Sequence, residues 1–125
     1  MMAASVVLSI GSNCRYEEVG LAINWLRGRL DGCRVSHEYL TPALQGYGAP
    51  YTNAVVSGLT GLGYDALEAS LKAYERARGR DETARQRGDV PVDIDIVVWN
   101  GEVTRPRDFR HDFFQIGYKV IINDY

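Results

Sequence analysis

Apolar residues follow two different periods along this chain, and the change of period separates predicted strands from predicted helices. Alternation or short apolar runs, which are typical of strands, cover residues 5–10, 33–40, 51–59 and 92–99. Apolar residues spaced by three and four positions, which lie on one face of a helix, cover residues 16–30 and 65–78. The predicted order is therefore strand, helix, strand, strand, helix, strand.

This order predicts one domain of the α+β class that spans residues 1–125. A βαββαβ chain is typical of the ferredoxin-like arrangement, an antiparallel sheet with helices on one face. We expect polar loops at residues 41–50 and 80–89, and a turn at Asn100 and Gly101. The tail from residue 107 onward carries aromatic and apolar residues, and we expect it to pack back on the body.

The most informative polar positions lie inside the last predicted strand. Alternation places Asp93 and Asp95 together on one face of this strand. The other face carries the apolar residues Val92, Ile94, Ile96 and Val98. With a rise of ~3.3 Å per residue, the two aspartates should stand about 6.6 Å apart along the strand. Mg²⁺ commonly takes one or two carboxylates together with substrate phosphates, so the pair predicts a divalent metal site.

The charged residues that precede this strand each allow two interpretations. Glu75 and Arg80, on either side of Gly79, form either a solvated helix end or the border of a site. The following loop also carries Arg85 and Arg87, which is usual for a solvated loop. Because the loop leads directly into the aspartates, it also suits a lid whose arginines bind a triphosphate.

Three further places in the chain also have a structural and a functional interpretation, and for Asn53 and His111 the structural one is the commoner. Gly11, Ser12 and Asn13 form either a simple capping turn or a set of backbone amides for a ligand. Asn53, inside an apolar strand, is either satisfied within the core or binds the edge of a heterocycle. His111 is more commonly a surface residue than a functional one.

Composition excludes several classes of partner. The formal net charge of −2 gives no general reason to expect nucleic acid or a membrane surface. No apolar run approaches the roughly 20 residues that span a bilayer, and the N-terminus lacks the basic start of a signal peptide. Cys14 and Cys33 lack metal-binding spacing. We therefore expect a cytoplasmic protein with free thiols and small-molecule partners, and the oligomeric state stays open.

Taken in order, these segments resemble 6-hydroxymethyl-7,8-dihydropterin pyrophosphokinase, an enzyme family of folate biosynthesis. The similarity runs through nearly the whole chain, as far as Gly117 and Tyr118. The other residues that carry it are Gly11 to Asn13, residues 39–42 and 51–54, Glu75, Gly79 and Arg80, and residues 92–96. Each motif is weak alone, whereas the ordered set with its spacing is specific.

The resemblance implies transfer of pyrophosphate from ATP to the pterin, with two Mg²⁺ ions held by Asp93 and Asp95. Arg80, at the triphosphate, would act with these aspartates as a catalytic residue. The implied pterin contacts are Thr41, Pro42, Leu44, Tyr51, Asn53 and Tyr118, of which Tyr118 would stack where the family usually has phenylalanine. The implied ATP contacts are Glu75, Arg80, Ile96, Arg110 and His111.

The chain departs from the family pattern in its lid and in its tail. An aromatic residue and an arginine of the family correspond to Arg87 and Val90, and a second arginine corresponds to Ile116. The chain also ends soon after Tyr118, without the usual C-terminal section. Fewer phosphate-binding cations predict weaker ATP binding or slower transfer. Two alternatives therefore stay open: a relative that binds pterin or nucleotide without efficient transfer, and an interaction domain with the aspartates at its surface.

Overall fold

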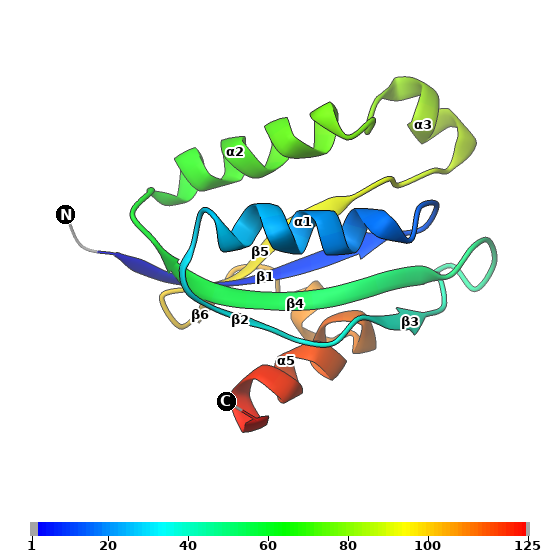
Figure 1. The fold of residues 1–125 in the computed structure, drawn as a ribbon. Helices are drawn as coiled ribbons and strands as arrows, with labels where there is room; N and C mark the ends of the chain where they lie inside the picture. The colour runs from blue at the N-terminus through cyan, green and yellow to red at the C-terminus, as the bar shows by residue number, and fades with distance from the viewer. Residues whose placement is uncertain (1–2, 125) are drawn as a thin grey trace.

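A six-stranded sheet with helices on both of its faces forms the body of the computed structural model, which describes residues 3–124 (Figure 1). The strands are β1 (Ala4–Ser12), β2 (Asp31–Val35), β3 (Tyr39–Thr41), β4 (Tyr51–Thr60), β5 (Asp93–Trp99) and β6 (Glu102–Val103). The helices are α1 (Glu17–Arg27), α2 (Tyr64–Ala77), α3 (Glu82–Arg87), α4 (Pro106–Arg110) and α5 (Asp112–Asp124). The predicted α+β class and ferredoxin-like arrangement are confirmed.

The sheet places the aspartate strand next to the first strand of the chain. Its order is β2-β4-β1-β5-β6, and β3 pairs with β4 as well. Every pair is antiparallel. The central strand β1 therefore has β4 along one side and β5 along the other, which brings the segments that carry Asn53, Gly11 and the two aspartates into three neighbouring strands.

Helices α1 and α2 lie on one face of the sheet and bury the larger hydrophobic cluster (Figure 1). Val6, Leu8 and Ile10, at alternate positions of β1, point into this cluster and meet Leu26 of α1 and Leu71 of α2. All five side chains are at most 1% exposed. Because full burial of one such side chain contributes about 1.5–3 kcal/mol, this cluster is sufficient to hold both helices on the sheet.

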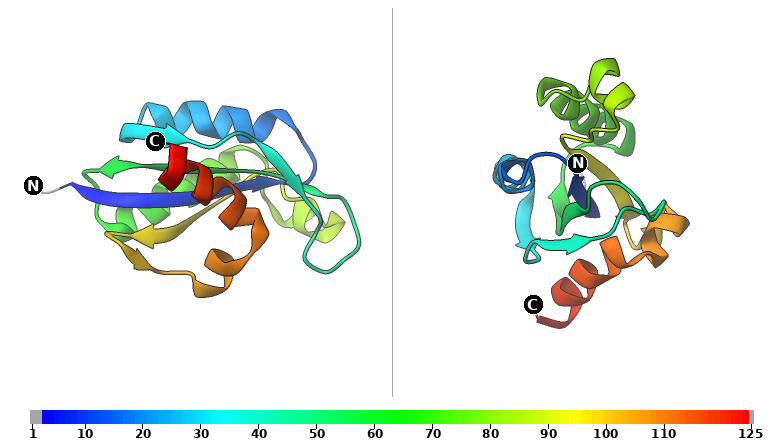
Figure 2. Two further views of the ribbon diagram at one scale, coloured as in Figure 1. Left: turned by 90° about the horizontal axis from the view of Figure 1, so that it is seen from below. Right: turned by 90° about the vertical axis from the view of Figure 1, so that its right-hand side faces the viewer.

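The tail packs back on the body, as expected, and it does so as α4 and α5 on the opposite face (Figures 1 and 2). Phe114 of α5 is fully buried there against Val55, Val97 and Ile121. The expectation of helices on one face therefore holds for α1 and α2, and the tail adds a helical layer on the other face.

A register shift in β5 reverses the alternation that the sequence predicts. The shift lies opposite Val7 and Leu8 of β1 and leaves Val97 as an extra residue on β5. A bulge of this kind turns the following side chains to the other face. Val98 consequently packs in the second cluster with Val97, and the prediction that it shares a face with Ile94 is wrong.

The charged segment 80–89, expected to be a loop, contains the short helix α3. The Asp81 carboxylate caps this helix by accepting a hydrogen bond from the Ala84 amide at 2.9 Å. Gly88 ends the helix with a φ of 76°, a left-handed conformation that favours glycine. The expected strand at 33–40 is likewise divided into β2 and β3. Within residues 3–124, none of these helices has the length and apolar character needed to cross a bilayer.

Candidate active site

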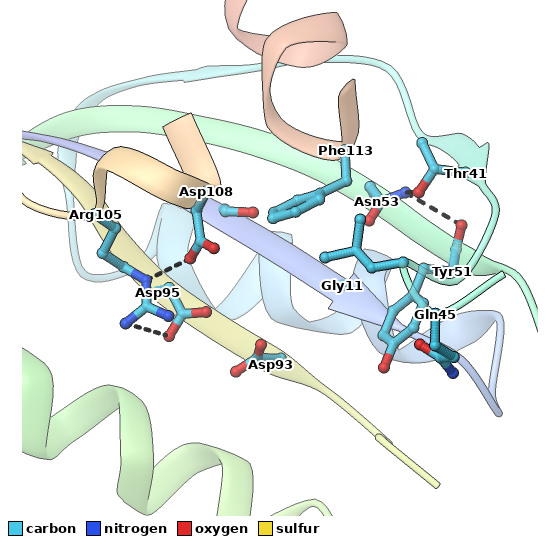
Figure 3. Close-up of a pocket in the computed structure, with 12 residues that line it drawn as sticks. Gly11, Thr41, Gln45, Tyr51, Asn53, Asp93, Asp95, Arg105, Asp108 and Phe113 are labelled. Atoms are coloured by element: carbon cyan, nitrogen blue, oxygen red, sulfur yellow. Dashed lines mark hydrogen bonds and ion pairs between the residues drawn. The ribbon is translucent and has the colours of Figure 1, made fainter. Parts of the chain in front are cut away.

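Asp93 and Asp95 lie side by side on the sheet face that carries α4 and α5 (Figure 3). The register with β1 places Gly11 opposite Asp93 and Ser9 opposite Asp95, so small residues flank both carboxylates. A Cβ atom at Gly11 would come within 3.4 Å of the Tyr51 ring. Glycine at this position therefore keeps the space between the aspartates and Tyr51 open.

That space is part of a cavity of about 230 Å³, here called the first cavity. The sheet contributes its floor, the segment around residues 41–51 contributes one wall, and the start of the tail contributes another (Figure 3). The lining residues are Ser9, Gly11, Thr41, Leu44, Gln45, Tyr51, Asn53, Asp93, Asp95, Arg105, Asp108 and Phe113. Two aromatic rings combined with a few convergent polar groups are typical of a small-molecule site.

Asn53 forms hydrogen bonds within the protein and also lines this cavity. Its side chain is buried, and Nδ2 donates to Thr41 Oγ1 at 2.8 Å and to the main-chain oxygens of Tyr51 and Tyr39 at 3.2 and 3.3 Å. These bonds hold β3 and the following segment against β4. They also fix the orientation of the amide, so the two interpretations left open for Asn53 are compatible.

Tyr39 holds the start of α5 in place, and with it the Phe113 ring that lines the cavity. Its hydroxyl donates to the Phe113 carbonyl oxygen at 2.6 Å and accepts from the Gly117 amide at 3.0 Å. Burial raises the pKa of Tyr39 to about 12, so the hydroxyl remains a donor. A Cβ atom at Gly117 would come within 2.8 Å of this hydroxyl oxygen. Glycine therefore allows the close approach that places Phe113 at the cavity.

Cations from α2 and from the segment after it contact both aspartates. Arg80 Nη1 lies 2.6 Å from Asp93 Oδ1 and 3.0 Å from Glu75 Oε1. Lys72 Nζ lies 3.3 Å from Asp95 Oδ1 and 3.0 Å from Glu75 Oε2. These contacts join three carboxylates and two cations into one network.

A third cation approaches Asp95 from the opposite side. Arg105 Nη1 lies 3.9 Å from Asp95 Oδ1, and its Nε donates to the Asp108 carboxylate (Figure 3). Arg105 precedes α4, so the tail supplies charge to the site as well as an aromatic ring.

Side chains of α2 reach the aspartates around the outer edge of β5. The Ile94 amide donates to Glu75 Oε2 at 2.7 Å, and the Ile94 carbonyl accepts from Lys72 Nζ at 3.2 Å. Glu75 is 3% exposed, which excludes its interpretation as a solvated helix end. It is a buried anchor that positions both Lys72 and Arg80.

Burial and mutual repulsion give the two aspartates different pKa values. Burial and the charge of Asp93 together raise the pKa of Asp95 to about 7. Burial is also the largest single influence on Asp93 and acts in the same direction, but Arg80 and Lys72 together outweigh it and lower the pKa of Asp93. A further cation nearby would make the ionised form of Asp95 less costly, so this carboxyl group is suited to bind one.

A second cavity of about 590 Å³ lies between α2 and α3, on the outer side of β5. Four cationic side chains line this second cavity: Lys72, Arg76, Arg80 and Arg85. Four acidic side chains line it as well: Glu75, Asp81, Glu82 and Asp89. An anionic ligand would bind here by replacing carboxylates as the partners of these cations. Lys72 and Arg80 also contact the aspartates of the first cavity, so the two cavities meet at this network.

The structure brings most of the predicted pterin contacts together. Thr41, Leu44, Tyr51 and Asn53 line the first cavity. Pro42 is exposed and lies outside this lining. Tyr118 is not brought to the cavity either, because it packs on Phe109 and Phe114 with ring centroids 5.5 and 5.1 Å apart. Phe113 supplies the aromatic ring instead.

The predicted ATP contacts are divided in the same way. Glu75 and Arg80 line the second cavity. Ile96 is buried in the larger hydrophobic cluster. Arg110 and His111 are exposed at the end of α4, away from the lining of either cavity.

Sequence reasoning overlooks Lys72, Arg105 and Phe113. Lys72 carries a usable signal, because it lies one helical turn before Glu75 and therefore on the same face of α2. Arg105 and Phe113 carry none, since their positions depend on how the tail folds back over the sheet.

The oxygen ligands at this site suit a hard cation. Among residues 3–124, no group of three or more His, Cys, Asp or Glu side chains is arranged to hold a metal ion. Asp93 and Asp95 nevertheless match the one or two carboxylates with which proteins hold Mg²⁺, the remaining ligands being phosphate oxygens and water. The donor set therefore fits a Mg²⁺ ion that is shared with a phosphate-bearing ligand.

Comparison with known families agrees with this geometry. The family model of 7,8-dihydro-6-hydroxymethylpterin-pyrophosphokinase (HPPK) matches residues 7–121, which include the lining of both cavities. No curated protein matches the chain. Because the family match covers nearly the whole chain, the chain belongs to the HPPK family, ATP-dependent diphosphokinases that transfer pyrophosphate from ATP to hydroxymethyldihydropterin in folate synthesis.

Proposed function

We propose that this chain carries out the family reaction with pterin in the first cavity, ATP in the second cavity, and Mg²⁺ at Asp93 and Asp95. The observation that carries this assignment is the junction between the cavities. Lys72 and Arg80 line the second cavity and contact the aspartates that line the first. A transfer between two bound substrates requires such a meeting point, because its rate depends on holding the reacting atoms together.

The first cavity supports binding of a flat, polar heterocycle. Tyr51 and Phe113 present aromatic rings, and Asn53 and Thr41 present polar groups at the end of the cavity away from the aspartates (Figure 3). A ring system bound there would direct a substituent toward the carboxylates. This arrangement agrees with a pterin whose hydroxymethyl group is the reacting group.

The second cavity supports binding of a polyphosphate. Among the residues that the structure describes, the Arg85 side chain is paired only with Glu82, at 3.1 Å, and both side chains are largely exposed. An exposed pair of this kind is worth about 0–1 kcal/mol, so Arg85 can exchange its partner for phosphate at little cost. Arg80 and Lys72 lie deeper and would neutralise the phosphates that reach the aspartates.

The reaction consists of attack by the hydroxymethyl oxygen on the β-phosphorus of ATP. As the new oxygen–phosphorus bond forms, the bond between the α- and β-phosphates breaks, AMP leaves, and the hydroxyl proton is released. Asp93 and Asp95 would hold Mg²⁺, which when bound would supply charge neutralisation at the phosphates and polarisation of the attacking hydroxyl. Arg80 and Lys72 would bind non-bridging phosphate oxygens, since this kind of transfer depends mainly on positioning and charge neutralisation.

The test is an assay of AMP formation from ATP and hydroxymethyldihydropterin, with and without Mg²⁺. We expect AMP formation to require both pterin and Mg²⁺, and Asp95→Asn to lower kcat by at least about 100-fold, because loss of a metal ligand removes several kcal/mol of transition-state stabilisation. Asp65→Asn on the exposed first turn of α2 is the matched control and should keep full activity. Full activity of Asp95→Asn would disprove the metal assignment.

Val90 supports a second candidate function. It lines the second cavity at the position where the family resemblance expects an arginine. A chain with too little phosphate-binding charge would bind pterin or nucleotide without efficient transfer. Calorimetry with pterin and α,β-methylene-ATP, run beside the AMP assay, distinguishes the two: ligand binding without turnover identifies a binding module.

A further inference from the structure

The Lys72 ammonium group lies inside a cage of oxygen atoms. Nζ lies 3.0 Å from Glu75 Oε2, 3.2 Å from the Ile94 carbonyl oxygen and 3.3 Å from Asp95 Oδ1. Asp93 Oδ1 follows at 3.9 Å and Glu68 Oε1 at 3.7 Å. Oxygen atoms gathered around one positive centre in this way resemble the surroundings of a bound cation.

Buried parts of the fold hold two of the oxygen atoms that surround the Lys72 ammonium group. Glu75 and the Ile94 main chain are buried parts of α2 and β5, so two of the nearest oxygens are rigid. Ion pairs with Glu75 at 3.0 Å and with Asp95 at 3.3 Å hold the Lys72 ammonium group in this position. Its side chain is only 33% exposed.

A divalent ion cannot share this side of the aspartate pair with the lysine. Mg²⁺ binds carboxylate oxygens at 2.0–2.1 Å, whereas Lys72 Nζ already lies 3.3 Å from Asp95 Oδ1 and 3.9 Å from Asp93 Oδ1. An ion that bridged these two oxygens on the α2 side would lie close to the ammonium group and be repelled by it. The first cavity, on the other side of the pair, is lined by Arg105, whose Nη1 lies 3.9 Å from Asp95 Oδ1 and whose Nε pairs with Asp108. This guanidinium is 48% exposed and lies farther from Asp95 than Lys72 does, so a divalent ion can approach the pair more easily from this side.

We propose that the Lys72 ammonium group takes the place of one of the two Mg²⁺ ions that the family resemblance implies. The chain then binds a single divalent ion at Asp93 and Asp95, on the side of the first cavity. Lys72 is the fixed second positive charge beside the phosphates. The inference rests on the proposed function, because that function brings the metal and the nucleotide to this site.

The experiment counts Mn²⁺ ions on the full-length protein in the presence of saturating α,β-methylene-ATP, by equilibrium dialysis and electron paramagnetic resonance. The parent chain should bind close to one ion per chain and give the resolved spectrum of an isolated Mn²⁺. Lys72→Gln should bind close to two ions and give the broadened spectrum of a coupled pair, since two-metal sites hold their ions roughly 3.5–4 Å apart.

The chain offers a matched control, because Lys119 is its only other lysine and is exposed on α5. Lys119→Gln should bind one ion, as the parent does. Lys72→Arg, which keeps the charge, should also bind one ion and remains informative if the glutamine variant is unstable. Two ions on the parent chain, or two ions on Lys72→Arg, would overturn the proposal, and so would a single ion on folded Lys72→Gln.

The AMP assay separates this inference from the proposed function. A parent chain that forms AMP and binds two ions keeps the proposed function and contradicts the role of Lys72. A chain without turnover whose ion count rises from one to two in Lys72→Gln supports the role of Lys72 and contradicts efficient transfer.

Discussion

Asp95 is the residue at which stability and the proposed activity oppose each other. Folding places it beside Asp93 in a largely buried position and raises its pKa to about 7, compared with about 3.9 in an unfolded chain. The folded protein therefore favours the protonated form. As the pH rises from about 4 through 7, ionisation of Asp95 removes stability from the metal-free protein.

Asp95→Asn should therefore stabilise the metal-free protein at high pH while it lowers kcat by at least about 100-fold. Since asparagine stays neutral, we expect the variant to exceed the parent chain by on the order of 1–3 kcal/mol near pH 8, and the two to converge near pH 4. Urea denaturation with a chelator at several pH values measures this difference. Asp65→Asn serves again as the control, and a stability difference that does not change with pH would contradict the pKa assignment.

Among the secondary-structure elements, α3 depends most on its two ends. It has six residues and only Ala84 is buried, whereas isolated helices shorter than about 12–15 residues are marginal in water. The Asp81 cap and the left-handed Gly88 therefore decide whether the lid segment is ordered. Because α3 carries Arg85, its order also sets where that arginine stands in the second cavity.

Asp81→Ala should loosen α3 without unfolding the protein. Loss of an N-cap costs about 1 kcal/mol, which corresponds to roughly fivefold faster hydrogen exchange in a segment that opens locally. Exchange at the amides of residues 84–88 should accelerate, while the melting temperature stays nearly constant. Gln86→Ala, exposed on the same helix, is the control; unchanged exchange in Asp81→Ala would show that the cap does not hold the lid.

The elements that the sequence predicts best are those whose burial is periodic. Both large helices and the aspartate strand have one buried face, and that face is visible as spacing. The bulge at Val97 depends on pairing with β1, and α3 has no apolar face, so neither leaves a periodic signal.

The same distinction holds for the site. Asp93 and Asp95 are recognisable because they interrupt an apolar strand. Phe113 reaches the first cavity in place of Tyr118 only because Tyr39 holds the start of α5. A contact between residues so far apart in the sequence cannot be read from either segment alone.

For the whole molecule, the decisive feature is one sheet shared by two hydrophobic clusters. Ala54 and Val56 of β4 belong to the larger cluster, whereas Val55 between them belongs to the smaller one. Because both clusters pack on the same strands, disruption of the sheet on one face would expose the cluster on the other face. This supports the expectation that residues 1–125 form a single domain.

Unfolding should therefore be one cooperative transition. Phe114→Ala in the smaller cluster should cost about 3–5 kcal/mol, and it should lower the unfolding midpoint equally by far-UV circular dichroism and by fluorescence of Trp25 and Trp99, which pack on the larger cluster. Ile122→Ala, 55% exposed on α5, should change stability by less than about 0.5 kcal/mol. Two separate transitions in Phe114→Ala would contradict a single domain.

The way α2 holds β5 also bears on self-association. A strand without a neighbour offers its free amides and carbonyls to a strand of another molecule, a common start of aggregation. Here the outward-facing amide of Ile94 donates to Glu75, and its carbonyl oxygen accepts from Lys72. Thr104 donates from its hydroxyl to the Ile96 carbonyl at 2.9 Å and from its amide to the Val97 carbonyl at 2.8 Å. The side chains that gather charge around the aspartates therefore also protect this strand from pairing with a second copy of the chain.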